Sequence, residues 1–326
     1  MVLFQKLVGR VIIQENKMAQ FTNTDTQGTC FYGEETGTHE CLLSEGGEGN
    51  LQSDYFLCEK NPGHKEFTPV KSFRLENLPE LYRDPGLYEY VKAVAELTVR
   101  LEVTVTSPHR PEFYPGTQVP FPFYDLRGKK TMRYGSGQIN VFKYENGNGC
   151  DCRGSALDIF GDIYKKICKT CPCKKCQSSE VPSTIWWEIV VHTAAHVVFD
   201  DVEASENTNC KLFYDEQDSD VFIIDDLRVS EINLMEDVCL LQYSTCDESI
   251  GKKLFQKNEH LWNVWMMSLA LYTTRADDKL CFIVSHPHGS TKQVSFGRWV
   301  DKVTVEFERV FREDQNHLLH KHVPRE

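Results

Sequence analysis

The chain has 326 residues, 40% of them apolar and 26% charged, and its formal net charge is −12. This composition is typical of a globular protein rather than a disordered one, and the excess of acidic residues argues against nonspecific binding to nucleic acid, which needs clustered Lys and Arg. No stretch approaches the roughly 20 apolar residues of a membrane-spanning helix, and no secretory signal with its cleavage site is recognised at the N-terminus. We therefore expect a cytoplasmic protein that binds neither membrane nor nucleic acid.

The first 129 residues divide into two regions that differ in composition and in apolar periodicity. Residues 1–73 are rich in Gly, Thr, Ser, Glu and Asn and have few periodic apolar positions, so we expect them to be loosely ordered. Residues 74–129 predict an extension made of a helix, a strand and a proline-rich connector. Apolar residues fall on one helical face in residues 87–97, and apolar and polar residues alternate in residues 98–105.

From Lys130 onward, short runs of β-branched residues separated by polar or Gly-containing turns predict a mainly β fold. These runs are GQINVFKY, WWEIVVHTA, DVFIIDDLRV, DVCLLQY, LCFIVSH and KVTVEFERV. Regularly spaced short strands are typical of a sandwich or a barrel. The segment NEHLWNVWMMSLALYTTRA fits either a helix or a buried strand, because its periodicity alone does not decide between them.

Four motifs along these strands are candidates for chemistry or for close packing. They are Tyr134-Gly135-Ser136-Gly137, Thr193-Ala194-Ala195-His196, Asp237-Val238-Cys239-Leu240-Leu241 and His286-Pro287-His288-Gly289. The two small alanines before His196 allow a tight turn that gives the ring one orientation, as a general base requires. The glycines on either side of Ser136 let that strand approach its neighbour closely.

In this order, the motifs resemble those of the chymotrypsin-like (trypsin-fold) serine proteases, over residues 130–300. The resemblance implies a double β-barrel in which His196 is the general base and Asp237 orients and stabilises its ring. It implies hydrolysis of a protein or peptide substrate, with no cofactor needed for catalysis. Residues 130–250 would form the first barrel and residues 251–326 part of the second. The resemblance also explains the pair His286 and His288 as strand and turn in preference to metal ligands.

A cysteine-rich insertion at residues 150–176 departs from the common pattern of this family. It holds Cys150, Cys152, Cys168, Cys171, Cys173 and Cys176. Cysteines paired at such spacing suit one tetrahedral Zn²⁺ with sulfur ligands, which would be structural because four thiolates leave no open position. Two or three disulfides, or free thiols, are the alternatives; the lack of a recognised leader favours zinc.

The serine of the family lies in a Gly-x-Ser-Gly motif of the second barrel, and this sequence has no serine after Ser295. We therefore expect the chain as given to be inactive as a peptidase. A shifted reading frame near the end of the chain would explain the missing serine. Codons that encode the last residues can be chosen so that, read one base later, they encode the start of a Gly-x-Ser-Gly motif. An alternative exon and a natural truncation remain open. The rival function is a non-catalytic pseudoprotease that binds partners through its acidic face or its cysteine insertion; the coding DNA distinguishes the two.

Overall fold

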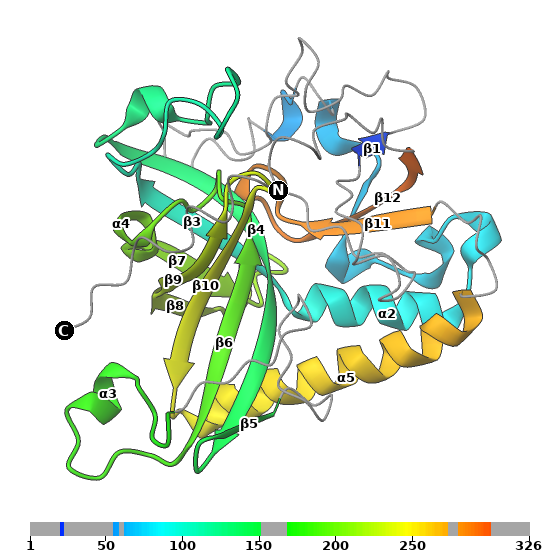
Figure 1. The fold of residues 1–326 in the computed structure, drawn as a ribbon. Coiled ribbons are helices and arrows are strands. Elements are labelled where there is room, and N and C mark those ends of the chain that lie inside the picture. Colours follow the sequence, from blue (N-terminus) through cyan, green and yellow to red (C-terminus); the bar gives the residue numbers. More distant parts are fainter. Residues whose placement is uncertain (1–19, 23–54, 59–61, 151–167, 273–279, 301–326) are drawn as a thin grey trace.

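The computed structural model describes residues 20–22, 55–58, 62–150, 168–272 and 280–300. These residues form a mainly β fold, as predicted, and contain two antiparallel sheets and two long helices (Figure 1). In chain order the elements are β1 (Gln20–Thr22), β2 (Phe67–Pro69), α2 (Pro85–Glu96), β3 (Thr98–Val105), β4 (Lys130–Glu145), β5 (Asn148–Cys150), α3 (Lys174–Gln177), β6 (Ile185–Thr193), α4 (Asp201–Ala204), β7 (Ser205–Leu212), β8 (Phe222–Asp226), β9 (Arg228–Asn233), β10 (Val238–Thr245), α5 (Glu248–Tyr272), β11 (Leu280–Ser285) and β12 (Gln293–Val300).

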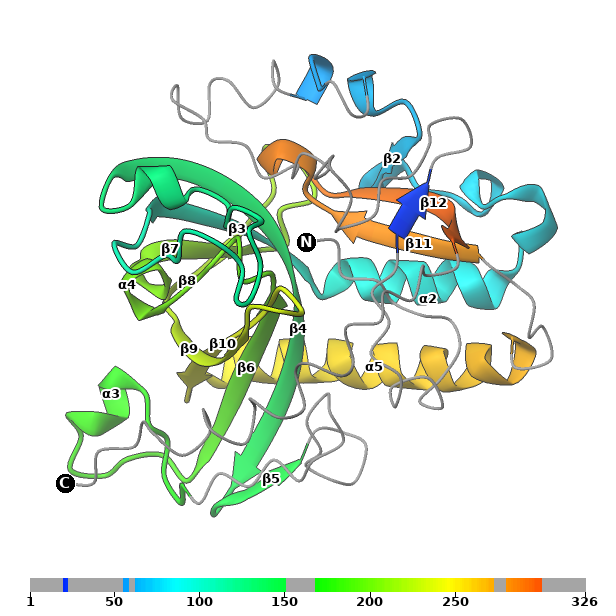
Figure 2. The same cartoon turned by 45° about the horizontal axis from the view of Figure 1, so that its top comes forward.

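The larger sheet has eight strands and curls into part of a barrel. Its strand order is β8-β7-β3-β4-β6-β10-β9, with β5 paired to β4. The two edge strands, β8 and β9, follow one another in the chain with only Leu227 between them, so the curl brings both edges of the sheet to the same corner (Figure 2). Apolar side chains of β3, β4, β6 and β10 meet inside the curl and form the main core, together with Ile250 and Leu254 of α5.

Two glycines explain how β4 can follow the curl. A Cβ atom on Gly135 would lie 2.4 Å from a methyl carbon of Val197, and one on Gly137 would lie 2.7 Å from a methyl carbon of Val191. Real side chains do not tolerate such distances without a shift of the neighbouring residue. Gly137 therefore allows the close approach of β4 to β6 that was predicted, whereas Gly135 allows β4 to approach the segment that follows β6.

The smaller sheet has four strands, and its core is separate from that of the curled sheet. The hairpin β11–β12 is extended by β2 and β1, which both pair with β12. Helices α2 and α5 lie side by side along this sheet (Figures 1 and 2). Their apolar faces meet Phe282 and Val294 of the hairpin in a second cluster. Helix α2 therefore belongs to this cluster.

The segment NEHLWNVWMMSLALYTTRA, whose periodicity fits either a helix or a buried strand, is helical over residues 258–272, because it lies within α5. The helix begins after Asp247, whose carboxylate accepts hydrogen bonds from the backbone N–H groups of Ser249 and Ile250. Among the described residues no helix is long and apolar enough to cross a membrane.

The expected regions at the two ends are described only in part. Residues 67–69, within the region expected to be loosely ordered, form β2. The described residues of 251–326 form α5 and one hairpin, and these residues alone do not make a second barrel. The predicted strand KVTVEFERV lies outside the described residues, as does Cys152 of the insertion.

Candidate active site

His196 and Asp237, the two predicted catalytic residues, are in direct contact. His196 Nδ1 lies 2.6 Å from Asp237 Oδ2, and the backbone N–H of His196 donates to Asp237 Oδ1 at 2.9 Å. Because an ionised carboxylate can only accept hydrogen bonds, Nδ1 must carry the proton, which leaves Nε2 of the neutral ring as an acceptor. This is the tautomer that a general base needs.

Both side chains are buried, and their surroundings favour an ionised carboxyl beside a neutral ring. Burial alone would raise the pKa of Asp237, but the His196 ring and its N–H groups outweigh burial and lower that pKa to about 2. Burial lowers the pKa of His196 below its usual 6.5, while the Asp237 carboxylate acts in the opposite direction. The ring is therefore able to accept a proton at neutral pH and to transfer it onward.

The strands that hold this pair are neighbours in the curled sheet. β6 and β10 are antiparallel, with Thr193 opposite Cys239. Residues 194–200, which carry His196 and are called the histidine loop here, therefore leave β6 where β10 begins. The N–H of Ala195 donates to the Asp237 carbonyl at 3.3 Å, which continues the pairing past the end of β6. Asp237 itself has φ of +54°, a left-handed conformation that aspartate tolerates better than most residues. The histidine and the aspartate thus meet because of strand register.

The turn that carries His196 is as tight as its small residues predicted. Ala194 and Ala195 are fully buried. The Ala194 carbonyl accepts hydrogen bonds from the N–H groups of Val197 at 3.0 Å and Val198 at 3.1 Å. Any larger side chain at either alanine would have to displace the core around this turn.

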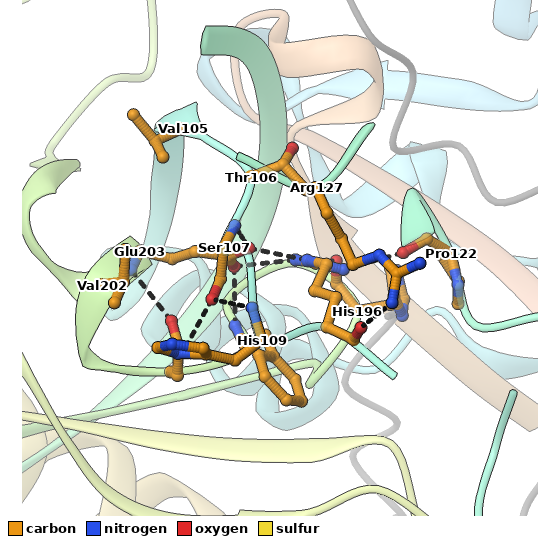
Figure 3. Close-up of polar contacts among 12 residues, drawn as sticks. Val105, Thr106, Ser107, His109, Pro122, Arg127, His196, Val202 and Glu203 are labelled. Carbon is orange, nitrogen blue, oxygen red and sulfur yellow. Dashed lines mark hydrogen bonds and ion pairs between the residues drawn. The ribbon is translucent and has the colours of Figure 1, made fainter. Parts of the chain in front are cut away.

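A buried ionic network, which was not predicted from the sequence, is hydrogen-bonded to the backbone of the same loop (Figure 3). The Glu203 carboxylate is fully buried and binds two fully buried arginines: Arg110 at 2.6 and 2.7 Å, and Arg133 at 2.5 Å. It also accepts the backbone N–H groups of Ser107 and Phe199, both at 2.8 Å. Burial would raise the pKa of Glu203, but the hydrogen bonds and charges of the arginines lower it. Glu203 is therefore a fully satisfied anion.

The two arginines extend this network to the histidine loop. Arg110 Nη2 donates to the carbonyl of His196 at 3.0 Å, and Arg133 Nε donates to the carbonyl of Val197 at 2.9 Å. Arg110 comes from the proline-rich connector, so this connector contacts the loop as well as linking β3 to β4. We conclude that Glu203 positions the loop through Arg110 and Arg133, while Asp237 positions the ring.

The turn His286-Pro287-His288-Gly289 of the smaller sheet packs on β4, the strand of the larger sheet that carries Gly135-Ser136-Gly137. The backbone N–H of His286 donates to Ser136 Oγ at 2.8 Å, so Ser136 serves as an acceptor between the sheets. Gly289 lies against the Tyr134 ring, where an added Cβ would approach within 2.5 Å. The buried Lys292 Nζ donates at 2.7 Å to Oδ1 of Asp215, which lies between β7 and β8 of the larger sheet. The Tyr134–Gly137 and His286–Gly289 motifs are far apart in the sequence but contact each other in the structure. This contact region is called the joint between the sheets.

The cysteine insertion is brought together only in part. Sulfur atoms of Cys171, Cys173 and Cys176 lie within 4.8 Å of one another and of Cys246, a residue that sequence reasoning missed. Cys150 and Cys168 are described but do not belong to this group, and Cys152 lies outside the described residues. The described cysteines form no disulfide with one another.

The group of four suits a tetrahedral metal by its chemistry. Four sulfur donors from two chain segments lie within 4.8 Å of one another, and the N–H of Ser183 donates to Cys176 Sγ at 3.5 Å. Cys173 directly precedes the single turn of α3 and Cys176 lies within it, where the Cys176 N–H donates to the Cys173 carbonyl at 2.9 Å. A cysteine pair on such a turn can bind one ion from two directions.

Comparisons of this chain with protein-family models, with curated proteins and with solved structures found no match.

Proposed function

We propose that this chain is a trypsin-fold serine endopeptidase domain that contributes the histidine and aspartate of the catalytic triad. The observation that carries the proposal is the 2.6 Å contact between His196 Nδ1 and Asp237 Oδ2 at adjacent strand ends of a curled antiparallel sheet. A buried carboxylate that accepts Nδ1–H fixes the tautomer of the ring and stabilises the imidazolium that forms during acyl transfer. The substrate would be a protein or a peptide.

The double barrel that this family implies is part of the same proposal. The curled sheet would be its first barrel. The hairpin β11–β12 would begin its second, with the His286-Pro287-His288-Gly289 segment as the joint between the two. Support comes from the packing of that segment on Tyr134 and Ser136, because a trypsin-fold site lies where two barrels meet.

The chemical role of each residue follows from its contacts. Nε2 of His196 would take the proton from a serine hydroxyl as that oxygen attacks the peptide carbonyl, and would return the proton to the leaving amine. Asp237 would hold its charge throughout, since its pKa of about 2 keeps it ionised. The 326 residues contain no Gly-x-Ser-Gly segment. Ser136 is a poor nucleophile candidate because its Oγ accepts the His286 N–H.

We further propose that Cys171, Cys173, Cys176 and Cys246 bind a structural Zn²⁺. Cys246 directly follows β10, the strand that Asp237 precedes. A metal at this point would therefore tie the insertion to the far end of the strand that carries the active-site aspartate. Four thiolates would leave it no open position, so it would play no part in the reaction.

One observation favours the rival function, a pseudoprotease that binds partners without catalysis. His196 is only 1% exposed and Asp237 only 6% exposed. A general base must come within hydrogen-bond reach of its substrate, whereas a buried His–Asp pair can serve simply to hold two strand ends together.

The two functions are separated by labelling with a fluorophosphonate, which reacts only with an activated serine. The test compares the 326-residue chain with the product translated from the complete transcript, including any reading frame that encodes Gly-x-Ser-Gly. We expect the complete product to be labelled and the 326-residue chain to remain unlabelled. His196→Ala in the complete product should abolish labelling, because the serine loses its base.

His260→Ala is the matched control, since His260 is an exposed histidine on α5 and should leave labelling unchanged. A complete product that folds cooperatively and is never labelled would refute the peptidase and support the binding module. Labelling that survives His196→Ala would also refute the proposed role of this pair.

A further inference from the structure

A second group of metal-binding side chains lies away from the histidine–aspartate pair. Donor atoms of Cys58, His64 and His288 are all within 4.8 Å of one another. Cys58 and His64 come from the N-terminal part of the chain, whereas His288 belongs to the turn between β11 and β12. Three side chains from two distant parts of the sequence thus lie close together.

This group is buried and bordered by aromatic rings. Cys58, His64 and His288 are 7%, 2% and 5% exposed, respectively. The ring of Tyr55 stacks on that of His64 with centroids 4.4 Å apart, and Phe67 meets His64 edge to face at 4.8 Å. The His64 and His288 rings lie 5.0 Å apart at a steep angle of 74°. Two imidazoles and a thiol therefore lie together in a buried part of the molecule.

The backbone at both histidines is unusual in the same way. His64 has φ of +44° and follows Gly63 at +68°, while His288 has φ of +51° and precedes Gly289 at +74°. Non-glycine residues in this region are strained, and such strain persists where the surrounding structure requires one side-chain direction. At both positions a ring nitrogen lies within 4.8 Å of Cys58 Sγ.

We propose that Cys58, His64 and His288 bind Zn²⁺. One thiolate and two imidazoles are a ligand set of intermediate softness that suits zinc, whereas a carboxylate set would suit magnesium or calcium. Zinc bonds of about 2.0–2.3 Å place tetrahedral donors roughly 3.3–3.8 Å apart. Donors already within 4.8 Å would need only a small inward movement. Binding would release the thiol proton of Cys58, and the fourth position would hold a water molecule.

The site would fasten the N-terminal segment to the joint between the two sheets. Tyr55 Oη donates to Gln293 Oε1 at 3.3 Å, and β2 pairs with β12, so the N-terminal segment already docks beside this turn. The same turn contacts Tyr134 and Ser136 through Gly289 and His286. A zinc ion here would stabilise the joint against separation of the sheets, with or without peptidase activity.

The first test measures zinc per chain after purification without chelators. Exchanging His288 for Asn removes a ligand but keeps a residue that tolerates a left-handed backbone. We expect His288→Asn to lower the zinc content by one equivalent relative to wild type, and His288→Cys, which restores a ligand, to recover it. The matched control is His260→Asn, an exposed histidine whose exchange should change nothing. Equal zinc content in wild type and His288→Asn would overturn the proposal.

The second test needs no variant at this site and separates it from the four-cysteine site. X-ray absorption at the zinc edge reports which atoms bind the metal directly. In Cys246→Ser, which should empty the four-cysteine site, the zinc that remains should show imidazole nitrogen together with one sulfur. Scattering from sulfur alone in wild type, or no zinc at all in Cys246→Ser, would overturn the Cys58–His64–His288 site. Loss of one zinc in Cys246→Ser is a separate result that bears on the four-cysteine site.

Discussion

The histidine loop and the two cysteine- and histidine-containing clusters are held in different ways. Around His196, protein groups bind one another: Asp237 receives two N–H groups of that residue, and Glu203 binds two arginines. In the two clusters the donor atoms lie within 4.8 Å of one another, and in each the proposed metal would hold them there. The loop should therefore keep its geometry without any ion, whereas the clusters should depend on one.

Breaking the Glu203 network should have the largest effect on stability. Glu203→Gln keeps the shape of the side chain but leaves two fully buried guanidinium groups without an anion. Loss of one partner from a buried ion pair typically costs about 3–5 kcal/mol, and we expect the free energy of unfolding in urea to fall by this amount. Glu248→Gln, which affects an exposed pair with Lys252 on α5, should change it little. Similar small losses in both variants would mean that the network does not hold the loop.

Metal removal should sharpen the contrast between the loop and the clusters. A strong chelator should lower the melting temperature by about 5 °C or more, since metal binding contributes directly to folding and each kcal/mol is worth about 2–4 °C in a domain of this size. The NMR signal of the His196 Nδ1 proton should persist in the chelated protein below its melting temperature. A melting temperature unchanged by chelation would contradict the metal dependence of both clusters.

Acid should act on the loop through Asp237. Its pKa is lowered to about 2, so the stability from its charge is complete above the unfolded value of 3.8 and is lost as pH falls from about 4 to about 2. The contribution is on the order of 2 kcal/mol. Asp237→Asn tolerates the same left-handed backbone and should remove this part of the pH dependence in urea titrations. An identical pH profile for wild type and Asp237→Asn would contradict the assigned ionisation.

A smaller effect tests the close approach of β4 to the histidine loop. Gly135→Ala would place a methyl group 2.4 Å from a Val197 carbon, and overpacking of this kind costs about 1–3 kcal/mol. Adding Val197→Ala should recover part of the loss, a coupling that a double-mutant cycle measures. Strictly additive effects of the two substitutions would show that the two residues do not meet as described.

The site residues that sequence predicted best lie in short contiguous motifs. His196 follows an apolar strand and two alanines, and Asp237 directly precedes another strand, so pattern alone indicated both. Their meeting depends on the pairing of β6 with β10, which the order of the motifs suggested. The strand over residues 98–105 was predicted with its bounds, but its place inside the curled sheet, between β4 and β7, was not.

The residues that were missed are defined by contacts between distant segments. Glu203 follows Asp200 and Asp201 and has the sequence texture of a solvated acidic turn, although it is fully buried. Cys246 is far along the chain from the insertion, and only the pairing of β6 with β10 brings it near. Cys150 had the expected spacing but lies exposed on β5. Spacing predicts neighbours along one segment, whereas a buried charge or a fourth ligand depends on tertiary packing.

The most direct test of the central claim, that His196 and Asp237 are the base and orienter of a serine peptidase, is the pH dependence of fluorophosphonate labelling in the complete product. A neutral His196 is required, and its pKa lies below 6.5, so the labelling rate should rise with pH to a plateau with a midpoint below 6.5. Asp237→Asn should lower the plateau by orders of magnitude, because the ring loses its correct tautomer. A rate that is independent of pH between 4 and 8, or that is unchanged in Asp237→Asn, would contradict the account.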